Sequence, residues 1–239
     1  MNKPLIANAI FLLSVFVAIA QHKITPSVKI NLKLKEPSDV CLSASGKSLF
    51  MVSDNGELAE TDFNGNVLRK LRANLVDAEG VCAVNDKIYV ADEFTRSIHV
   101  FSVSDWKFMY EVPVAHTGAR NRGYEALTYN PVKKEFYLFT ESRPLLMLTL
   151  DEALRVKNRI ELNLKTDISA ACFHGVNLWL LSDEAAMVYL FNPAQNEAQA
   201  RFRLSVINPE GLAWLNDGKL LVVSDDRQQL YVYQETLKE

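Results

Sequence analysis

Acidic residues recur along this 239-residue chain at two fixed places in a repeating unit. The first place, where serine stands in two of the copies, is occupied by Ser38, Glu79, Glu125, Ser169 and Glu210, at successive intervals of 41, 46, 44 and 41 residues. The second place is occupied by Asp54, Asp92, Glu141, Asp183 and Asp225, at intervals of 38, 49, 42 and 42 residues. These two sets are called the first and second columns below.

The three glutamates of the first column would repel one another if their carboxylates converged, and the repulsion would raise the pKa of at least one of them. A bound cation is one way to relieve this repulsion. Oxygen-only ligands favour Ca²⁺ over zinc or copper, and the four histidines are scattered without metal-ligand spacing. We therefore expect a calcium ion, with its ligands drawn from Glu79, Glu125, Glu210, Ser38 and Ser169.

The elements that would position these acids are clearest in the stretch 208–234. An apolar run at Gly211–Leu215 is followed by an Asp-Gly turn and a second apolar run at Lys219–Val223, which is a strong hairpin signal. Because the two strands of a hairpin run antiparallel, Glu210 before the first strand and Asp225 after the second lie at the same end.

A repeat of this period, with three or four strands in each copy, is typical of β-propeller blades. We predict an all-β chain that folds as a single propeller of five four-stranded blades over residues 21–239. Six blades are the alternative if one interval hides a further hairpin. The fifth copy lacks a fourth strand, and Val28–Leu34, which alternates apolar and polar residues, would supply it and close the ring.

In such a blade the innermost strand begins, and the second strand ends, on the same face, so both columns should meet at one mouth of the central channel. We expect a ligand to bind at this mouth, next to the second column. Arginine side chains from the loop 118–123 match phosphate or carboxylate groups of such a ligand, and an aromatic ring can stack on it. The proposed ligand-binding residues are Asp54, Asp92, Glu141, Asp183, Asp225, Arg120, Arg122 and Tyr124. The alternatives are that these acids cap turns, that the arginines pair with them, and that Tyr124 fills a gap between blades.

Composition and the N-terminus bear on compartment and partners. The chain has 26 basic and 29 acidic residues, a net charge of -3, which argues against nucleic acid as a partner. Residues 1–20 combine Lys3, an uncharged apolar run and an Ala-Ile-Ala end, which indicates a signal peptide cut before Gln21. A retained anchor is the lesser alternative. We expect a periplasmic or extracellular monomer with no membrane span after cleavage.

The three cysteines, Cys41, Cys82 and Cys172, each lie three residues beyond a member of the first column. Three is an odd number and too few for a disulfide scaffold. We interpret them as small thiols that fill a core next to the crowded channel wall.

Motifs of common catalytic chemistries are missing from the sequence. It has no Gly-x-Ser-x-Gly elbow, P-loop, dinucleotide fingerprint or His-Glu-x-x-His. Serine, cysteine and zinc hydrolase chemistries are therefore disfavoured. A metal-assisted hydrolase remains open, because a calcium centre with one carboxylate base leaves no sequence motif.

Several blade openings carry a family resemblance. The segments DAEGV (77–81), GYEALTYNP (123–131), DISAACF (167–173), LWLLSDE (178–184) and NPEGLAW (208–214) resemble the SdiA-regulated, or YjiK-like, bacterial propellers. The resemblance implies an exported, cell-envelope-associated protein, distantly similar to calcium-dependent propeller lactonases and phosphotriesterases that place acids around a channel metal. The family tends to have glycine after the first-column residue, but this sequence has Asp39, Ala126 and Ala170 in blades 1, 3 and 4. A side chain at these positions leaves less room for a ligand to approach the backbone.

Three functions follow from these observations. The first is a ligand- or partner-binding module of the cell envelope with a calcium-binding channel mouth, whose small-molecule or envelope ligand the sequence does not name. The second is a calcium-dependent hydrolase of lactones or phosphoesters, in which Glu79, Glu125 and Glu210 hold the metal and Asp92 or Asp183 acts as base. The third is a purely structural propeller whose acids only cap turns.

Overall fold

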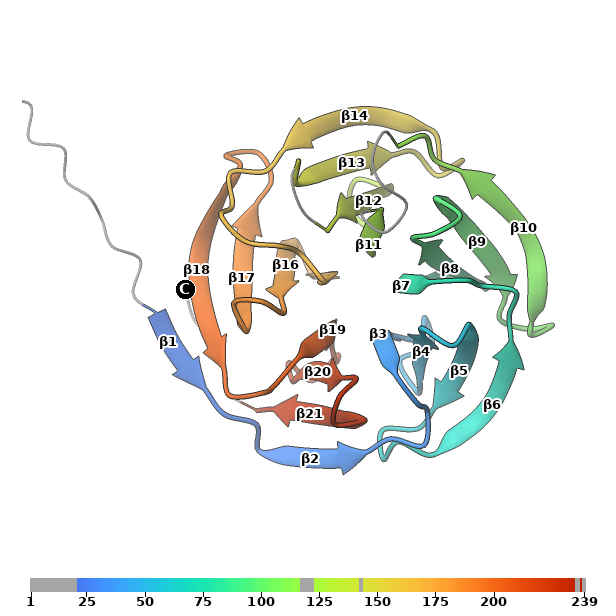
Figure 1. The fold of residues 1–239 in the computed structure, drawn as a ribbon, viewed down its shortest axis with the longest axis horizontal. Coiled ribbons are helices and arrows are strands. Elements are labelled where there is room, and N and C mark those ends of the chain that lie inside the picture. Colours follow the sequence, from blue (N-terminus) through green and yellow to red (C-terminus); the bar gives the residue numbers. More distant parts are fainter. Residues whose placement is uncertain (1–20, 117–122, 142–143, 235–236, 238–239) are drawn as a thin grey trace, which may run out of the picture.

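The computed structural model describes residues 21–116, 123–141, 144–234 and 237. In this part of the chain the secondary structure consists of 21 strands in five sheets, which surround a common centre (Figure 1). The predicted five-bladed propeller is therefore confirmed. The predicted signal peptide at 1–20 and the two arginines of the 118–123 loop, Arg120 and Arg122, lie outside the described residues.

The first two blades each take four consecutive strands. Blade 1 consists of β3 (Pro37–Leu42), β4 (Leu49–Ser53), β5 (Glu57–Thr61) and β6 (Val67–Arg72). Blade 2 consists of β7 (Ala78–Val84), β8 (Lys87–Asp92), β9 (Ser97–Ser102) and β10 (Lys107–Pro113). In each sheet the strands follow one another in sequence order from the channel outward.

The remaining blades repeat this plan. Blade 3 consists of β11 (Tyr124–Asn130), β12 (Glu135–Thr140), β13 (Leu146–Leu150) and β14 (Val156–Glu161). Blade 4 contains β15 (Ala170–His174), β16 (Asn177–Ser182), β17 (Met187–Asn192) and β18 (Glu197–Leu204). Blade 5 contains β19 (Pro209–Trp214), β20 (Leu220–Ser224) and β21 (Gln229–Tyr233).

The N-terminal strands join the last two blades and close the ring. Strand β2 (Val28–Asn31) pairs antiparallel with β21, so that Val28 faces Val232. The prediction that this segment completes the last blade is confirmed, although the strand ends at Asn31 and not at Leu34. Strand β1 (Gln21–Ile24) adds a fifth, parallel strand to the outer edge of β18, which the sequence did not predict.

Four of the innermost strands carry a β-bulge where the first column stands. The pairing with the second strand shifts by one residue at this point in blades 1, 2, 3 and 5. The extra residues are Ser38, Glu79, Glu125 and Glu210. In blade 4 the N–H of Ser169 bonds to the carbonyl of Leu181 at 3.0 Å, and Leu181 also pairs with Ala170. A bulge re-aims the side chain of its extra residue, so the backbone itself sets the direction of this column.

Apolar side chains fill the spaces between neighbouring blades. There are five such core clusters, each built from the facing sheets of two adjacent blades. Aromatic rings meet in them: Trp179 and Trp214 lie 5.0 Å apart between blades 4 and 5, and Tyr89 and Phe136 lie 4.6 Å apart between blades 2 and 3. This packing fixes the innermost strands around the channel.

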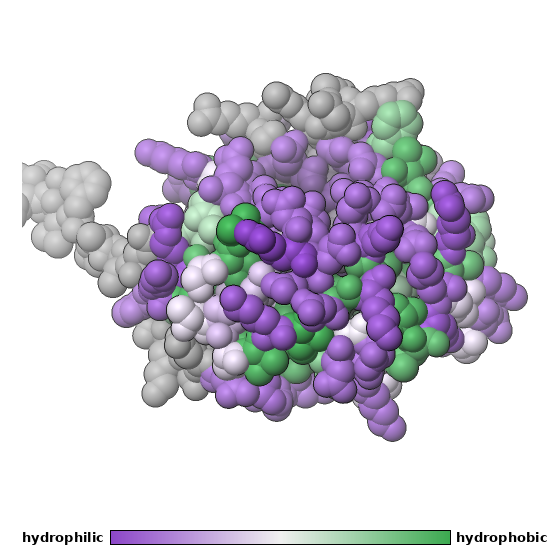
Figure 2. All heavy atoms as spheres, turned by 60° about the horizontal axis from the view of Figure 1, so that its bottom comes forward, coloured by the Kyte–Doolittle hydropathy of each residue, from purple (hydrophilic) through white to green (hydrophobic). Residues whose placement is uncertain are grey.

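The surface turned toward the viewer in Figure 2 is mostly hydrophilic, with hydrophobic residues in small separate groups. No helix long and apolar enough to cross a membrane occurs among residues 21–116, 123–141, 144–234 and 237.

Candidate functional site

A cavity of about 210 Å³ opens at the channel mouth where the innermost strands begin. Eight of the residues that line it are acidic, and the described part of the chain contributes no lysine, arginine or histidine to its wall. The lining residues are Ser38, Asp54, Glu79, Glu125, Glu141, Asp167, Ile168, Ser169, Asp183, Glu210 and Asp225. The cavity thus contains the whole first column and all of the second column except Asp92.

The glutamates of the first column all have raised pKa values. Burial is the largest cause, and the charges of neighbouring acids add to it. The pKa of Glu79 lies well above its usual range, with Asp54 the strongest neighbouring charge. Glu125 is similarly raised by burial and by Glu79, and the pKa of Glu210 reaches about 8. The repulsion expected from the sequence is present, but loss of water contributes more than like charge does.

A second group of carboxylates lies around Glu125. Oxygens of Glu93, Glu125 and Glu141 all lie within 4.8 Å of one another, a spacing at which one cation can contact all three. Glu93 is held in place because its Oε1 accepts a 2.7 Å hydrogen bond from the N–H of Gly123. A Cβ at Gly123 would lie 2.7 Å from the Cγ of Glu93, so the glycine allows this close approach.

Asp167 and Asp183 share a hydrogen bond on the blade 4 side of the cavity. Burial and the bond to Asp167 raise the pKa of Asp183 to about 7. Burial also acts to raise the pKa of Asp167, but hydrogen bonds from Asp183, Ser182 and Thr166 outweigh it and lower that pKa. The pair therefore shares one proton, which it loses around pH 7.

Two outer acids have neutral hydrogen-bond donors. The hydroxyl of Ser38 donates to Asp54, and the side-chain amide of Asn208 donates to Asp225 at 2.9 Å. Burial raises the pKa of Asp54 despite the bond from Ser38. Within the described residues, these contacts leave the mouth with a large excess of acid groups.

Two residues predicted for the ligand site do not line this cavity. Asp92 is fully buried and accepts backbone hydrogen bonds from Val76 at 2.7 Å and Thr95 at 2.8 Å, so it caps turns. Tyr124 is 1% exposed and packs between blades 2 and 3, and its hydroxyl donates to the carbonyl of Ala115 at 3.2 Å. Both placements match the structural alternatives stated from the sequence.

Sequence reasoning missed two acids of the site, Glu93 and Asp167. Glu93 directly follows Asp92, and of these adjacent acids it is Glu93 that approaches Glu125. Asp167 stands two residues before Ser169, as Asp77 stands two residues before Glu79. The repeated pattern of Asp, one residue, then the first-column residue was a signal that could have located Asp167.

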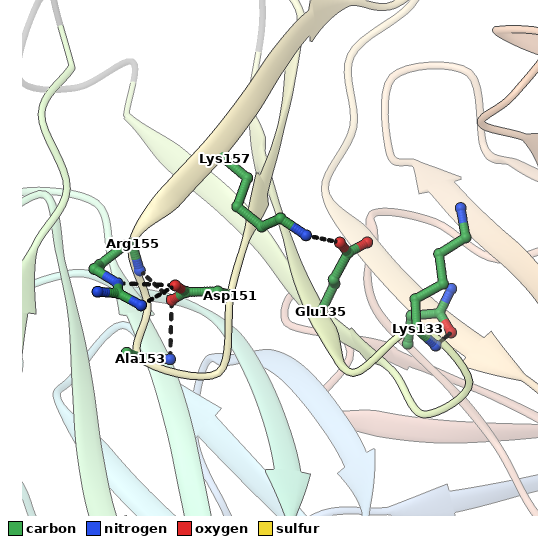
Figure 3. A network of polar contacts seen from close by, with 7 residues as sticks. Lys133, Glu135, Asp151, Ala153, Arg155 and Lys157 are labelled. Atoms are coloured by element: carbon green, nitrogen blue, oxygen red, sulfur yellow. Dashed lines mark hydrogen bonds and ion pairs between the residues drawn. The ribbon is translucent and has the colours of Figure 1, made fainter.

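Acids that only cap turns look different in this molecule. In the turn after β13, Asp151 accepts hydrogen bonds from the N–H groups of Ala153 and Arg155, at 3.0 and 2.9 Å, and from the Arg155 guanidinium (Figure 3). These bonds, led by the one from the Arg155 backbone, lower the pKa of Asp151. The pKa values of Glu79 and Glu210 at the channel mouth move the opposite way, because burial and neighbouring acids raise them. Turn capping therefore does not account for them.

The channel narrows directly behind the first column. The next residues along the innermost strands are Asp39, Gly80, Ala126, Ala170 and Gly211. A Cβ at Gly80 would lie 2.6 Å from the backbone nitrogen of Leu127, and one at Gly211 would lie 2.7 Å from the Cα of Asp39. The innermost strands thus touch at this level, which forms the floor of the acidic cavity.

The fold and the site together define a five-bladed β-propeller with an acidic channel mouth. The family model described as SdiA-regulated matches residues 17–205, and the chain belongs to that family.

Solved structures share the architecture at low sequence identity. Glutaminyl cyclase from Myxococcus xanthus is similar with a TM-score of 0.73 and 10% identity, over 89% of this chain and 98% of that one. The β-propeller domain of Cps50 (Swd1) from Myceliophteria thermophila gives a TM-score of 0.58 and 8% identity, over 87% and 100%. A streptogramin B lyase gives a TM-score of 0.52 and 15% identity, over 82% of this chain and 65% of that one. A search of curated proteins found no match. At these identities the likeness concerns the fold alone.

Proposed function

We propose that this protein is a ligand- or partner-binding module of the cell envelope whose acidic channel mouth binds Ca²⁺. The observation that carries the proposal is the concentration of eight acidic side chains around about 210 Å³, with no described basic residue in the wall. In such a site the repulsion between carboxylates is relieved either by protonation or by a bound cation. Calcium takes six to eight oxygen ligands in a flexible geometry, which a ring of carboxylates and serine hydroxyls can supply.

Glu125 is the residue on which the proposed ion depends most. Its carboxylate belongs to the group with Glu93 and Glu141, and it also interacts electrostatically with Glu79 in the neighbouring blade. A cation near Glu125 would therefore neutralise charge contributed by blades 2 and 3 together. Glu210, Ser38 and Ser169 line the same cavity. Among the described residues, however, the predicted ligands Glu79, Glu125 and Glu210 do not form a three-donor group within 4.8 Å, as Glu93, Glu125 and Glu141 do.

The cellular setting of the proposal comes from the sequence. Residues 1–20 have the pattern of an export signal, and the family resemblance implies an envelope protein. The bound ligand would contact the ion and the outer acids, so we expect it to carry its own oxygen donors or positive groups.

A thermal-shift experiment tests the proposal on the full mature chain. Calcium at 100 times its Kd would stabilise the folded state by about 2.7 kcal/mol, or roughly 5–10 °C in Tm for a domain of this size. Glu125→Gln removes one ligand charge and should abolish the shift. Glu197→Gln is the matched control, because Glu197 is an exposed acid at the start of β18, at the opposite end of the blade. Equal calcium shifts in both variants would refute the site, as would no shift in the wild type.

A calcium-dependent hydrolase is the second candidate, and the Asp167–Asp183 pair favours it. A carboxyl with a pKa of about 7 is poised to exchange a proton with substrate near neutral pH. Of the two bases considered from the sequence, Asp183 lines the cavity and Asp92 does not.

The enzymatic candidate is tested with a panel of lactones and phosphoesters in the presence of Ca²⁺. A peptide with N-terminal glutamine belongs in the panel, because a propeller of the same architecture is a glutaminyl cyclase. Turnover that Asp183→Asn abolishes, while the calcium shift in Tm persists, would establish an enzyme. If no substrate of the panel is turned over with calcium bound, the hydrolase is refuted and the binding module remains the proposed function.

A further inference from the structure

The opposite end of the channel has a second cavity, and all three cysteines of the chain line it. This cavity measures about 280 Å³ and lies beyond the narrow floor of the acidic mouth. One ring of its wall is formed by equivalent positions of the five innermost strands. In blade order these are Cys41, Cys82, Thr128, Cys172 and Ala213. Three thiols, one hydroxyl and one methyl group therefore face a common space.

The cysteines pack against the core, as the sequence suggested, and two of them are also partly exposed. Cys82, at 6% exposure, belongs to a core cluster, while Cys41 and Cys172 pack against two other clusters and are partly exposed. All three are free thiols. Cys41 and Cys82 stand at equivalent positions of β3 and β7, the innermost strands of adjacent blades, whereas Cys172 stands on β15, two blades away from either along the ring.

The chemistry of this cavity differs from that of the acidic mouth. Burial raises the pKa of all three thiols, so they are protonated and poor nucleophiles at neutral pH. Protonated thiols remain ligands for soft metal ions, which displace the protons. Among the described residues the cysteine sulfurs do not form a three-donor group within 4.8 Å. A preformed tetrahedral zinc site is therefore not supported, whereas an ion that needs only two ligands is compatible with a pair.

We propose that Cys41 and Cys82 bind one soft, two-coordinate cation of the Cu(I) class in this second cavity. Each thiol releases its proton to solvent and forms one metal–sulfur bond in place of a ligand that the ion carried in solution, and the ion keeps its oxidation state. The site is independent of the calcium proposal, because it uses other residues, softer donors and the other side of the channel floor.

The test is an anaerobic competition between the full mature chain and a chromophoric Cu(I) chelator. The wild type should remove one equivalent of Cu(I), and neither added Ca²⁺ nor the Glu125→Gln substitution should change this. Cys41→Ser and Cys82→Ser should each weaken binding by at least about a hundredfold, since even outer-shell partners change metal affinity by about 10–100-fold. Cys172→Ser, in the same ring, is the matched control and should stay within a few-fold of the wild type.

Melting curves of each variant, with Cys→Ala as a second substitution, separate loss of a ligand from loss of the fold. Failure of the wild type to compete for Cu(I) would overturn the proposal. So would a loss in Cys172→Ser as large as in Cys41→Ser, because the pair would then not be the binding unit. If the wild type binds Cu(I) but not Ca²⁺, only the proposed function is refuted.

Discussion

The carboxylate of Asp39 in blade 1 accepts a 2.8 Å hydrogen bond from the backbone N–H of Val81 in blade 2. Its other oxygen accepts a 3.3 Å bond from the N–H of Leu212 in blade 5. Innermost strands are sheet edges, whose outward N–H groups have no strand partner. One side chain therefore satisfies edge amides of both neighbouring blades, and it does so in the floor between the two cavities.

Replacing Asp39 should destabilise the propeller. Asp39→Ala leaves two buried amides without an acceptor, and we expect a loss of about 1–3 kcal/mol for each such group, measured by urea unfolding. Asp39→Asn keeps one carbonyl acceptor of nearly the same shape and should cost less. If Asp39→Ala unfolds at the wild-type urea concentration, the cross-blade bonds contribute nothing to stability.

Because the innermost strands lie in close contact, adding a single methyl group between them should destabilise the fold. Gly80→Ala would place a Cβ 2.6 Å from the backbone nitrogen of Leu127, and such overpacking costs about 1–3 kcal/mol. Gly218→Asn is the control, because a Cβ at Gly218 has nothing within 4 Å and its φ of +81° is one that asparagine tolerates. We expect a lower Tm for Gly80→Ala than for Gly218→Asn, and the reverse order would contradict the close packing.

Stability without calcium should fall as pH rises. The pKa of Glu210 is about 8 in the folded protein, against an ordinary value of 4.5, so the folded state keeps a proton that the unfolded state releases. The free energy of unfolding contributed by this group is therefore complete below about pH 4.5 and is lost progressively up to about pH 8. We expect the Tm in EDTA to decrease by on the order of 5 °C between pH 5 and pH 8.

Two variants assign that pH dependence to the site. Glu210→Gln, which cannot ionise, should reduce the decrease in Tm, with the remainder due to Glu79 and Glu125, whereas Glu197→Gln should retain the wild-type slope. The range begins at pH 5 because acids with lowered pKa values, such as Asp151, lose their own stabilisation only at lower pH. A Tm that rises from pH 5 to pH 8 in EDTA would show that the mouth acids are ionised and already paired.

The architecture was predictable because it depends on spacing alone. A period of about forty residues and a hairpin pattern fix the blade, and the unpaired last copy requires a strand such as Val28–Asn31 to complete it. Strand β1 was not predictable, because Gln21–Ile24 is only four residues long and contributes just one strongly buried apolar side chain, Ile24.

The site was only partly predictable. The spacing of residues gives their positions along a strand, but it does not give the direction in which side chains point once the strand has ended. Asp92 and Glu93 are adjacent, yet Asp92 turns inward to cap two amides while Glu93 reaches the carboxylate group around Glu125. The β-bulges that aim the first column were likewise invisible, since they arise from how two strands pair. The direction of the glutamate pKa shifts was foreseen, but burial, their main cause, depends on how the whole ring closes.

Calorimetric titration of the mature chain with Ca²⁺ at pH 6 and at pH 8 tests the central claim most directly. We expect ion binding to displace protons from the glutamates whose pKa values are raised, among them Glu210 with a pKa of about 8. Affinity should therefore rise by up to about tenfold per pH unit for each proton released. The heat should also depend on the buffer, because the buffer takes up those protons. Tight binding at pH 8 that weakens strongly at pH 6 is the predicted result. No calcium binding at pH 8, or equal affinity at both pH values, would contradict a calcium site built from these carboxylates.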